Sequence, residues 1–91
     1  MKREALMVKL KEKFGINTRT TEQWNGTNGG IWCTNDGRID FRPALDYNAW
    51  EFDPKETTYV MGVHKELMAF LTDAGWFAEP YDPETWFIYL S

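Results

Sequence analysis

The sequence predicts an α+β domain in which two helices cover an antiparallel sheet of about four to six strands. Two observations predict this class. Apolar residues recur at helical spacing in residues 2–14 and 64–74. Short β-prone runs, separated by Asn, Asp, Gly and Pro, occupy the remainder. The expected order is α-β-β-β-(β)-α-β-β in a single domain, residues 1–91, because a chain of 91 residues is too short for two independent cores.

The first helix is predicted over residues 2–14. Leu6, Leu10 and Phe14 recur every four residues and form its apolar stripe. Gly15 follows where a helix commonly ends on a left-handed residue, and Ile16 can make the accompanying hydrophobic contact. We therefore expect this helix to end at Phe14.

Strands and turns are predicted from residue 17 to residue 52. Residues 18–24 favour an extended stretch, and the Asn- and Gly-rich residues 25–30 end it in a loop or wide turn. Residues 31–34 read as a short strand and residues 35–37 as a tight turn. The alternation in residues 38–42 predicts one further strand.

The segment after this strand has two interpretations. Pro43 ends the strand or places it at an edge, since proline cannot donate to a ladder. Beyond it, Leu45, Tyr47 and Ala49 alternate again. This segment is either a further strand or an ordered loop that carries exposed aromatic residues.

A second helix and a terminal hairpin complete the domain. The helix is expected from about His64 to Ala74, with Gly75 ending it. Residues 76–79 and 85–90 are β-prone and flank a turn rich in Pro and Asp, which predicts a hairpin. Filling of the core is expected from five aromatic residues: Trp32, Phe41, Phe70, Phe87 and Tyr89.

Charge is divided unevenly along the chain, although the net charge is only −4. Residues 1–43 carry eight Lys and Arg against five Asp and Glu, whereas residues 44–91 carry nine Asp and Glu against two Lys. Eleven of the fifteen aromatic residues also lie in residues 44–91. Such asymmetry between the halves of a chain indicates interaction chemistry.

Residues suited to catalysis or metal binding are scarce. Cys33 is the only thiol and His64 the only imidazole, and nothing in their spacing pairs them as nucleophile and base. Cys33 lies in an apolar run, where a free cysteine usually behaves as a small buried hydrophobe. One Cys and one His do not make a zinc site. We expect a protein that is not an enzyme and uses no cofactor or metal.

The acidic, aromatic half supplies the main candidate for partner binding. Carboxylates alternate there with large rings beside turns rich in Pro and Asp. The rings would anchor a basic partner, and the acids would steer it into register. The residues predicted to bind are Trp50, Glu51, Asp53, Tyr81, Asp82, Glu84 and Trp86.

Two alternatives remain. Lys9, Lys11 and Lys13 on the first helix could bind the phosphates of a nucleic acid, which would make the chain a nucleic-acid accessory factor. A sequence pI near 4.9 weighs against a general nucleic-acid binder. The apolar run 86–90 could instead pair with its copy in a second chain, giving a homodimer.

Composition also indicates the cellular location of the protein and the class of proteins that it resembles. One cysteine allows no intramolecular disulfide, and no run reaches the roughly 18 apolar residues of a membrane span, so we expect a cytoplasmic protein without membrane contact. In size, acidity and aromatic content the chain resembles small proteins of bacteriophages and mobile elements, among them anti-CRISPR and other anti-defence inhibitors. This resemblance implies a stoichiometric inhibitor, in the host cytoplasm, of a nucleic-acid-binding host protein or complex. The basic first half departs from a whole-surface DNA mimic, so at most one face is expected to imitate phosphate.

Overall fold

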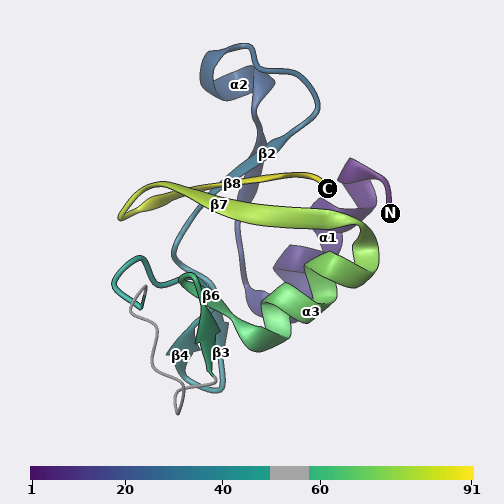
Figure 1. The fold of residues 1–91 in the computed structure, drawn as a ribbon. Helices are drawn as coiled ribbons and strands as arrows, with labels where there is room; N and C mark the ends of the chain where they lie inside the picture. The colour runs from purple at the N-terminus through teal and green to yellow at the C-terminus, as the bar shows by residue number, and fades with distance from the viewer. Residues whose placement is uncertain (50–57) are drawn as a thin grey trace.

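The computed structural model describes residues 1–49 and 58–91 of the chain. Helices and short strands alternate along it and confirm the α+β class (Figure 1). In chain order the elements are α1 (Arg3–Phe14), β1 (Thr18–Thr20), α2 (Glu22–Asn25), β2 (Ile31–Thr34), β3 (Arg38–Ile39), β4 (Arg42–Pro43), β5 (Tyr59–Val60), β6 (Val63–His64), α3 (Lys65–Ala74), β7 (Trp76–Asp82) and β8 (Thr85–Leu90).

The main sheet has four strands in the order β1-β2-β8-β7, and all neighbours are antiparallel. The predicted terminal hairpin is confirmed as β7–β8. The expectation that residues 86–90 form an edge open to a second chain is wrong, because β2 and β7 occupy both sides of β8. The edges of this sheet are β1 and β7.

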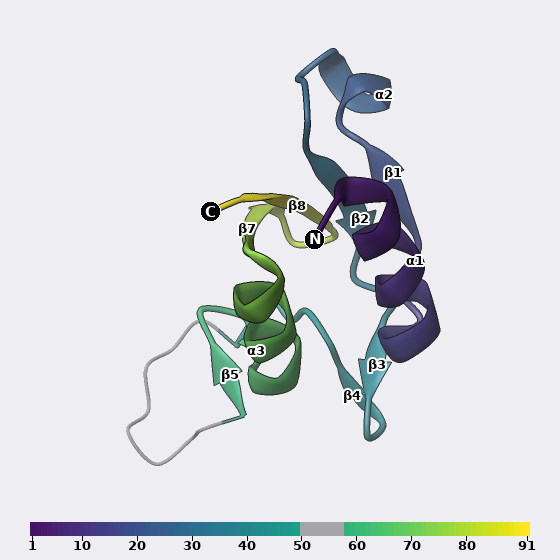
Figure 2. The same cartoon turned by 90° about the vertical axis from the view of Figure 1, so that its right-hand side faces the viewer.

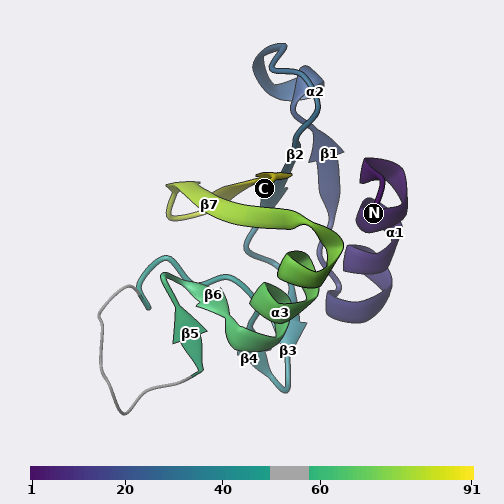
Figure 3. The same cartoon turned by 45° about the vertical axis from the view of Figure 1, so that its right-hand side comes forward.

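Two helices, α1 and α3, lie on one side of the main sheet, while α2 stands on the other side (Figures 1 and 3). The core between helices and sheet is apolar, as the periodicity of both helical segments predicts. Among the described residues, no helix combines the length and apolar character that crossing a membrane requires. Fully buried side chains come from α1 (Leu6, Leu10), α3 (Leu67, Leu71), β2 (Ile31, Cys33) and β8 (Trp86, Ile88).

Both long helices end where the sequence predicts. Gly15 has a φ of 68°, and the N–H groups of Gly15 and Ile16 donate to the carbonyls of Lys11 and Leu10. Gly75 closes α3 in the same left-handed conformation, with a φ of 85°. At the other end of α3, the imidazole Nδ1 of His64 accepts the backbone N–H of Glu66 at 3.1 Å.

The single strand predicted over residues 38–42 is wrong. Asp40 (φ 50°) and Phe41 (φ 68°) reverse the chain in a two-residue turn, so β3 and β4 form a tight hairpin (Figure 2). Phe41 is at the tip, 102 % exposed, and does not enter the core as expected. The reason is that alternating residues in a short run also fit a hairpin when two of them adopt positive φ.

The extended stretch predicted over residues 18–24 is only partly correct. It forms β1 up to Thr20, after which the N–H groups of Trp24 and Asn25 donate to the carbonyl of Thr21. These bonds wind residues 22–25 into the short helix α2. Trp24 therefore projects from a helical turn beyond the end of β1.

The segment after Pro43 makes long-range backbone contacts at residues 44–46. Leu45 forms a bridge with Val63 of β6, and the N–H of Asp46 donates to the carbonyl of Gly62. Gly62 and Val63 both belong to the β5–β6 hairpin, which the sequence did not indicate. Its turn carries two left-handed residues, Met61 (φ 52°) and Gly62 (φ 82°).

Replacing Phe41 with Gly should raise the free energy of unfolding by about 1 kcal/mol, because an L side chain at positive φ costs about 1–2 kcal/mol and Gly does not. The fully exposed ring gives up no packing in return. Urea unfolding followed by circular dichroism measures the change. Phe41→Ala is the matched control and should bring no comparable gain, since alanine keeps a Cβ at the same φ. A lower stability of the Gly variant would contradict this account of the turn.

Candidate functional site

Side chains along β8 alternate between the two faces of the main sheet. Trp86 and Ile88 are fully buried on the face that α1 and α3 cover. Because successive side chains of a strand point to opposite sides, Phe87 and Tyr89 lie on the other face. Within residues 1–49 and 58–91, no long helix packs on that face, which we call the outer face of the sheet.

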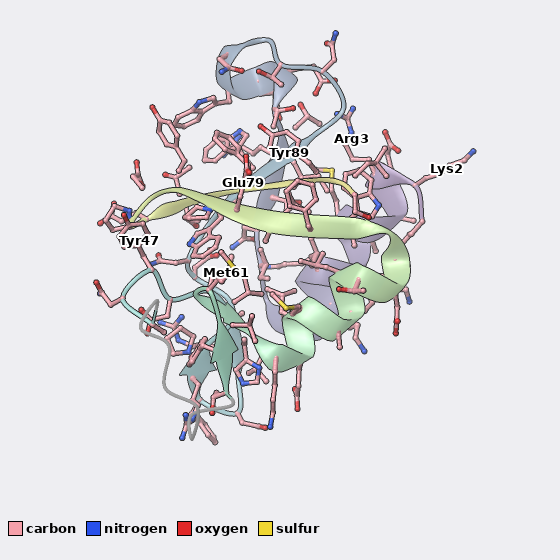
Figure 4. The ribbon with its side chains drawn as sticks, in the orientation of Figure 1. Lys2, Arg3, Tyr47, Met61, Glu79 and Tyr89 are labelled. Carbon is pink, nitrogen blue, oxygen red and sulfur yellow. The ribbon has the colours of Figure 1, made fainter. Side chains whose placement is uncertain are left out.

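Strand register extends the outer face onto both neighbours of β8. In β2, Trp32 is directly opposite Phe87. In β7, Phe77 is opposite Tyr89, and Glu79 is opposite Phe87. Figure 4 shows Glu79 and Tyr89 together on the side of β7 and β8 that faces α2. One carboxylate is thereby placed among several rings.

Aromatic rings form a continuous cluster across the outer face. The ring centroids of Trp24 and Trp32 are 5.0 Å apart, and those of Tyr81 and Phe87 are 5.5 Å apart. Trp24 joins the two pairs, since its centroid lies 5.5 Å from that of Tyr81 and 5.8 Å from that of Phe87. The cluster continues through Tyr89 to Phe77. We call the six residues the aromatic face: Trp24, Trp32, Phe77, Tyr81, Phe87 and Tyr89.

Much of this aromatic surface is open to solvent. Tyr81 is 59 % exposed, Phe77 41 % and Trp24 38 %, whereas Phe87 beneath them is 9 % exposed. Large apolar side chains scattered singly on a surface are ordinary. Exposed rings that contact one another and share a buried floor are instead typical of an interaction surface.

The contacts of α2 fix the position of Trp24. The guanidinium of Arg3 in α1 lies 2.7 Å from the carboxylate of Glu22. The pKa of Glu22 is lowered by hydrogen bonds from its own backbone N–H and from that of Gly29, with a smaller effect of Arg3. The hydroxyl of Thr21 donates to the carbonyl of Thr27 and accepts the N–H of Gly30. These bonds hold α2 over the end of the sheet.

Gly30 allows Tyr89 to lie close against the backbone before β2. A Cβ at position 30 would lie 2.5 Å from Cε1 of Tyr89 and 2.9 Å from Cγ2 of Thr21. Any larger residue would push the Tyr89 ring away from the strand. Gly30 is thus required for the packing of the aromatic face at this point.

Acidic side chains lie at the hairpin end of the aromatic face. The ladder of β7 and β8 shifts register between Pro80 and Asp82, which leaves Tyr81 as an extra residue in β7. Asp82 accepts the backbone N–H of Glu84 at 2.9 Å and so stabilises the turn. Tyr81, Asp82 and Glu84, three residues of the predicted partner site, are therefore adjacent.

The remaining residues of that predicted site have different outcomes. Trp86 was expected at the surface, and this is wrong: it is 0 % exposed. Its neighbour Phe87 takes the outer face, so the period of two directs Trp86 into the core. Trp50, Glu51 and Asp53 lie outside the described residues.

Several residues of the outer face were missed or misplaced by the sequence analysis. Trp32, Phe87 and Tyr89 were expected in the core. Phe87 is indeed buried, although from the outer face, whereas Trp32 and Tyr89 are only half-buried. Glu79 was not among the candidates. The available signal was the alternation in residues 86–90, which separates Phe87 and Tyr89 from Trp86 and Ile88. The alternation does not say which set is buried. That depends on which side of the sheet α1 and α3 cover.

The three lysines of the alternative nucleic-acid site each have a separate local partner. Lys9 lies 3.7 Å from Glu12, and Lys11 donates to the side-chain oxygen of Asn17 at 2.8 Å. The Nζ of Lys13 lies 5.6 Å from the ring centroid of Phe70. Helix α1 thus carries lysines whose charges are partly engaged within the protein.

Cys33 is 1 % exposed, as expected of a small buried hydrophobe. Burial, with a smaller effect of the negative charge of Asp36, raises the pKa of its thiol to about 12. The imidazole of His64 is occupied in capping α3. Among residues 1–49 and 58–91, no three His, Cys, Asp or Glu side chains gather where a metal ion could be held.

Comparison with protein-family models, with curated proteins and with solved structures finds no match to this chain.

Cys33 should resist alkylation by iodoacetamide at pH 8 in the native protein, because a thiol with a pKa near 12 is almost wholly protonated there and is also shielded. Labelling should become complete in denaturant, which exposes the thiol and restores its ordinary pKa. Mass spectrometry of the labelled chain measures both states. Rapid native labelling would contradict the burial of β2.

Proposed function

We propose that this protein is a non-catalytic binding module that docks on a basic surface of a protein partner through its aromatic face and the adjacent acids. The observation that carries the proposal is the outer face itself. Six contacting rings cover the side of the sheet that α1 and α3 leave open, with Glu79, Asp82 and Glu84 beside them.

Energetic considerations support this use of the rings. Aromatic side chains exposed in a cluster lose part of the stability that burial would contribute, about 25 cal/mol for each Å² of apolar area. Tyr and Trp are the residues that most often dominate the binding energy of protein interfaces. Trp24 and Tyr81 supply both types on one surface, and their packing on Phe87 limits the side-chain freedom lost on binding.

The charge distribution favours a basic partner. Residues 44–91 carry nine acids against two lysines, and Asp82 and Glu84 belong to this half. Carboxylates at the rim of an apolar surface accelerate association with a positive surface and disfavour negatively charged partners. We propose that the partner is a nucleic-acid-binding host protein or complex and that the chain inhibits it stoichiometrically, in the manner of the anti-CRISPR-like proteins that it resembles.

The test is affinity capture from a bacterial lysate with the double variant Asp82→Asn, Glu84→Lys. Asparagine keeps the oxygen that accepts the Glu84 N–H, so the turn should persist. The wild-type chain should retain a nucleic-acid-binding protein with and without nuclease. The variant should retain about tenfold less of that protein, because the charge of the rim is reversed. Quantitative mass spectrometry measures retention, and thermal melting should show little change.

The matched control is Asp73→Asn, Glu66→Lys, which makes the same charge change at exposed positions of α3, away from the outer face. This control should retain the partner. Equal retention by both double variants would refute docking through the acidic rim. Retention that disappears after nuclease treatment would indicate nucleic acid as the ligand.

A further inference from the structure

Glu79 occupies a specific position on the outer face. It lies opposite Phe87 in the ladder and shares its side of β7 with Phe77, two residues earlier. Tyr81, on the other side of Glu79 in sequence, reaches the same surface, since its ring centroid lies 5.5 Å from that of Phe87. The carboxylate of Glu79 therefore emerges between aromatic side chains (Figure 4).

No cation within the described part of the chain pairs with Glu79. The ion pairs among residues 1–49 and 58–91 involve Glu4, Glu12 and Glu22. Across the strands from Glu79, the row of opposite residues runs through Phe87 and Trp32 to Arg19. Arg19 is the first cationic residue in this row and lies two strands beyond Phe87. An exposed carboxylate among rings is thus available to a cation from outside the protein.

The packing of the rings restricts which cation fits. Centroid distances of 5.0–5.8 Å show that Trp24 contacts Trp32, Tyr81 and Phe87 directly and that Tyr81 also contacts Phe87. A spherical ammonium group in an aromatic cage needs rings that stand apart around it. A ligand on this surface would have to lie on the rings instead of between them, which suits a flat group.

A guanidinium is the flat cation that proteins offer. It stacks on an aromatic ring and simultaneously donates two parallel N–H bonds to a carboxylate, whereas the ammonium of lysine is a compact point charge. Tyr81, at 59 % exposure, provides the open ring, and Glu79 provides the carboxylate beside it.

We propose that the outer face recognises an arginine side chain of the partner, stacked on Tyr81 and paired with Glu79. This inference rests on the function proposed above and specifies the chemistry of that partner. Asp82 and Glu84 would attract neighbouring basic residues of the same segment.

The experiment titrates the 91-residue chain with octa-arginine and with octa-lysine, which have equal charge, and follows the indole N–H signals by NMR. Octa-arginine should bind roughly tenfold more tightly and shift the signals of Trp24 and Trp32, because only a guanidinium combines stacking with bidentate pairing. Glu79→Gln and, separately, Tyr81→Ala should each remove most of this preference. Glu84→Gln is the control and should weaken both peptides alike.

Three results would overturn the inference. Equal binding of the two peptides would show general charge attraction, leaving the proposed docking to be decided by the capture experiment. An arginine preference that survives Glu79→Gln would place the arginine site elsewhere. A single-stranded oligonucleotide is titrated in the same way. If it binds more tightly than either peptide and this binding is lost in Tyr81→Ala, the outer face is a stacking surface for bases, which would contradict both proposals. Glu79→Gln removes only a charge at an exposed position, so the test does not depend on how well Tyr81→Ala folds.

Discussion

The burial of Trp86 in the central strand is the constraint on which the rest of the structure depends. Its indole lies on the helix-covered side of β8, and a Cβ at Gly62 would come within 2.9 Å of its Cη2. The main sheet and the β5–β6 hairpin therefore meet at this ring. Once Trp86 faces inward, the period of two sends Phe87 outward, and the cross-strand partners of Phe87 follow. A single side-chain orientation thus produces both the core and the outer face.

A small domain with a thin core gains stability from every large ring that it buries. In this protein several rings lie on the outer face, and only Phe87 among them is close to full burial. The aromatic face also combines segments that are distant in the sequence. Trp24 belongs to α2, whose position is fixed by the contact of Glu22 with Arg3 of α1. The basic first half of the chain consequently supports a surface whose charge comes from the acidic second half.

The sequence predicted those elements whose signals are local. Apolar spacing and a following glycine defined α1 and α3, and two β-prone runs around a Pro/Asp turn defined the β7–β8 hairpin. It failed where a few left-handed residues redirect the chain. Asp40 and Phe41 turn a predicted strand into a hairpin, and the hydrogen bonds to the Thr21 carbonyl turn a predicted strand end into α2. Both turns are made by local backbone conformation and short-range hydrogen bonds, which the alternation of residue types does not reveal.

The sequence by itself determined the fold class, the ends of both long helices, the division of charge and the proximity of Tyr81, Asp82 and Glu84 within one hairpin. Tertiary structure alone decided which set of alternating side chains in β8 faces the helices, and so that Trp86 is buried while Phe87 and Tyr89 join Trp24, Trp32 and Glu79 outside. The physical reason is that a period of two assigns side chains to two faces but does not determine which face is buried. The buried face is the one covered by the apolar stripes of α1 and α3, which can cover only one side of the sheet.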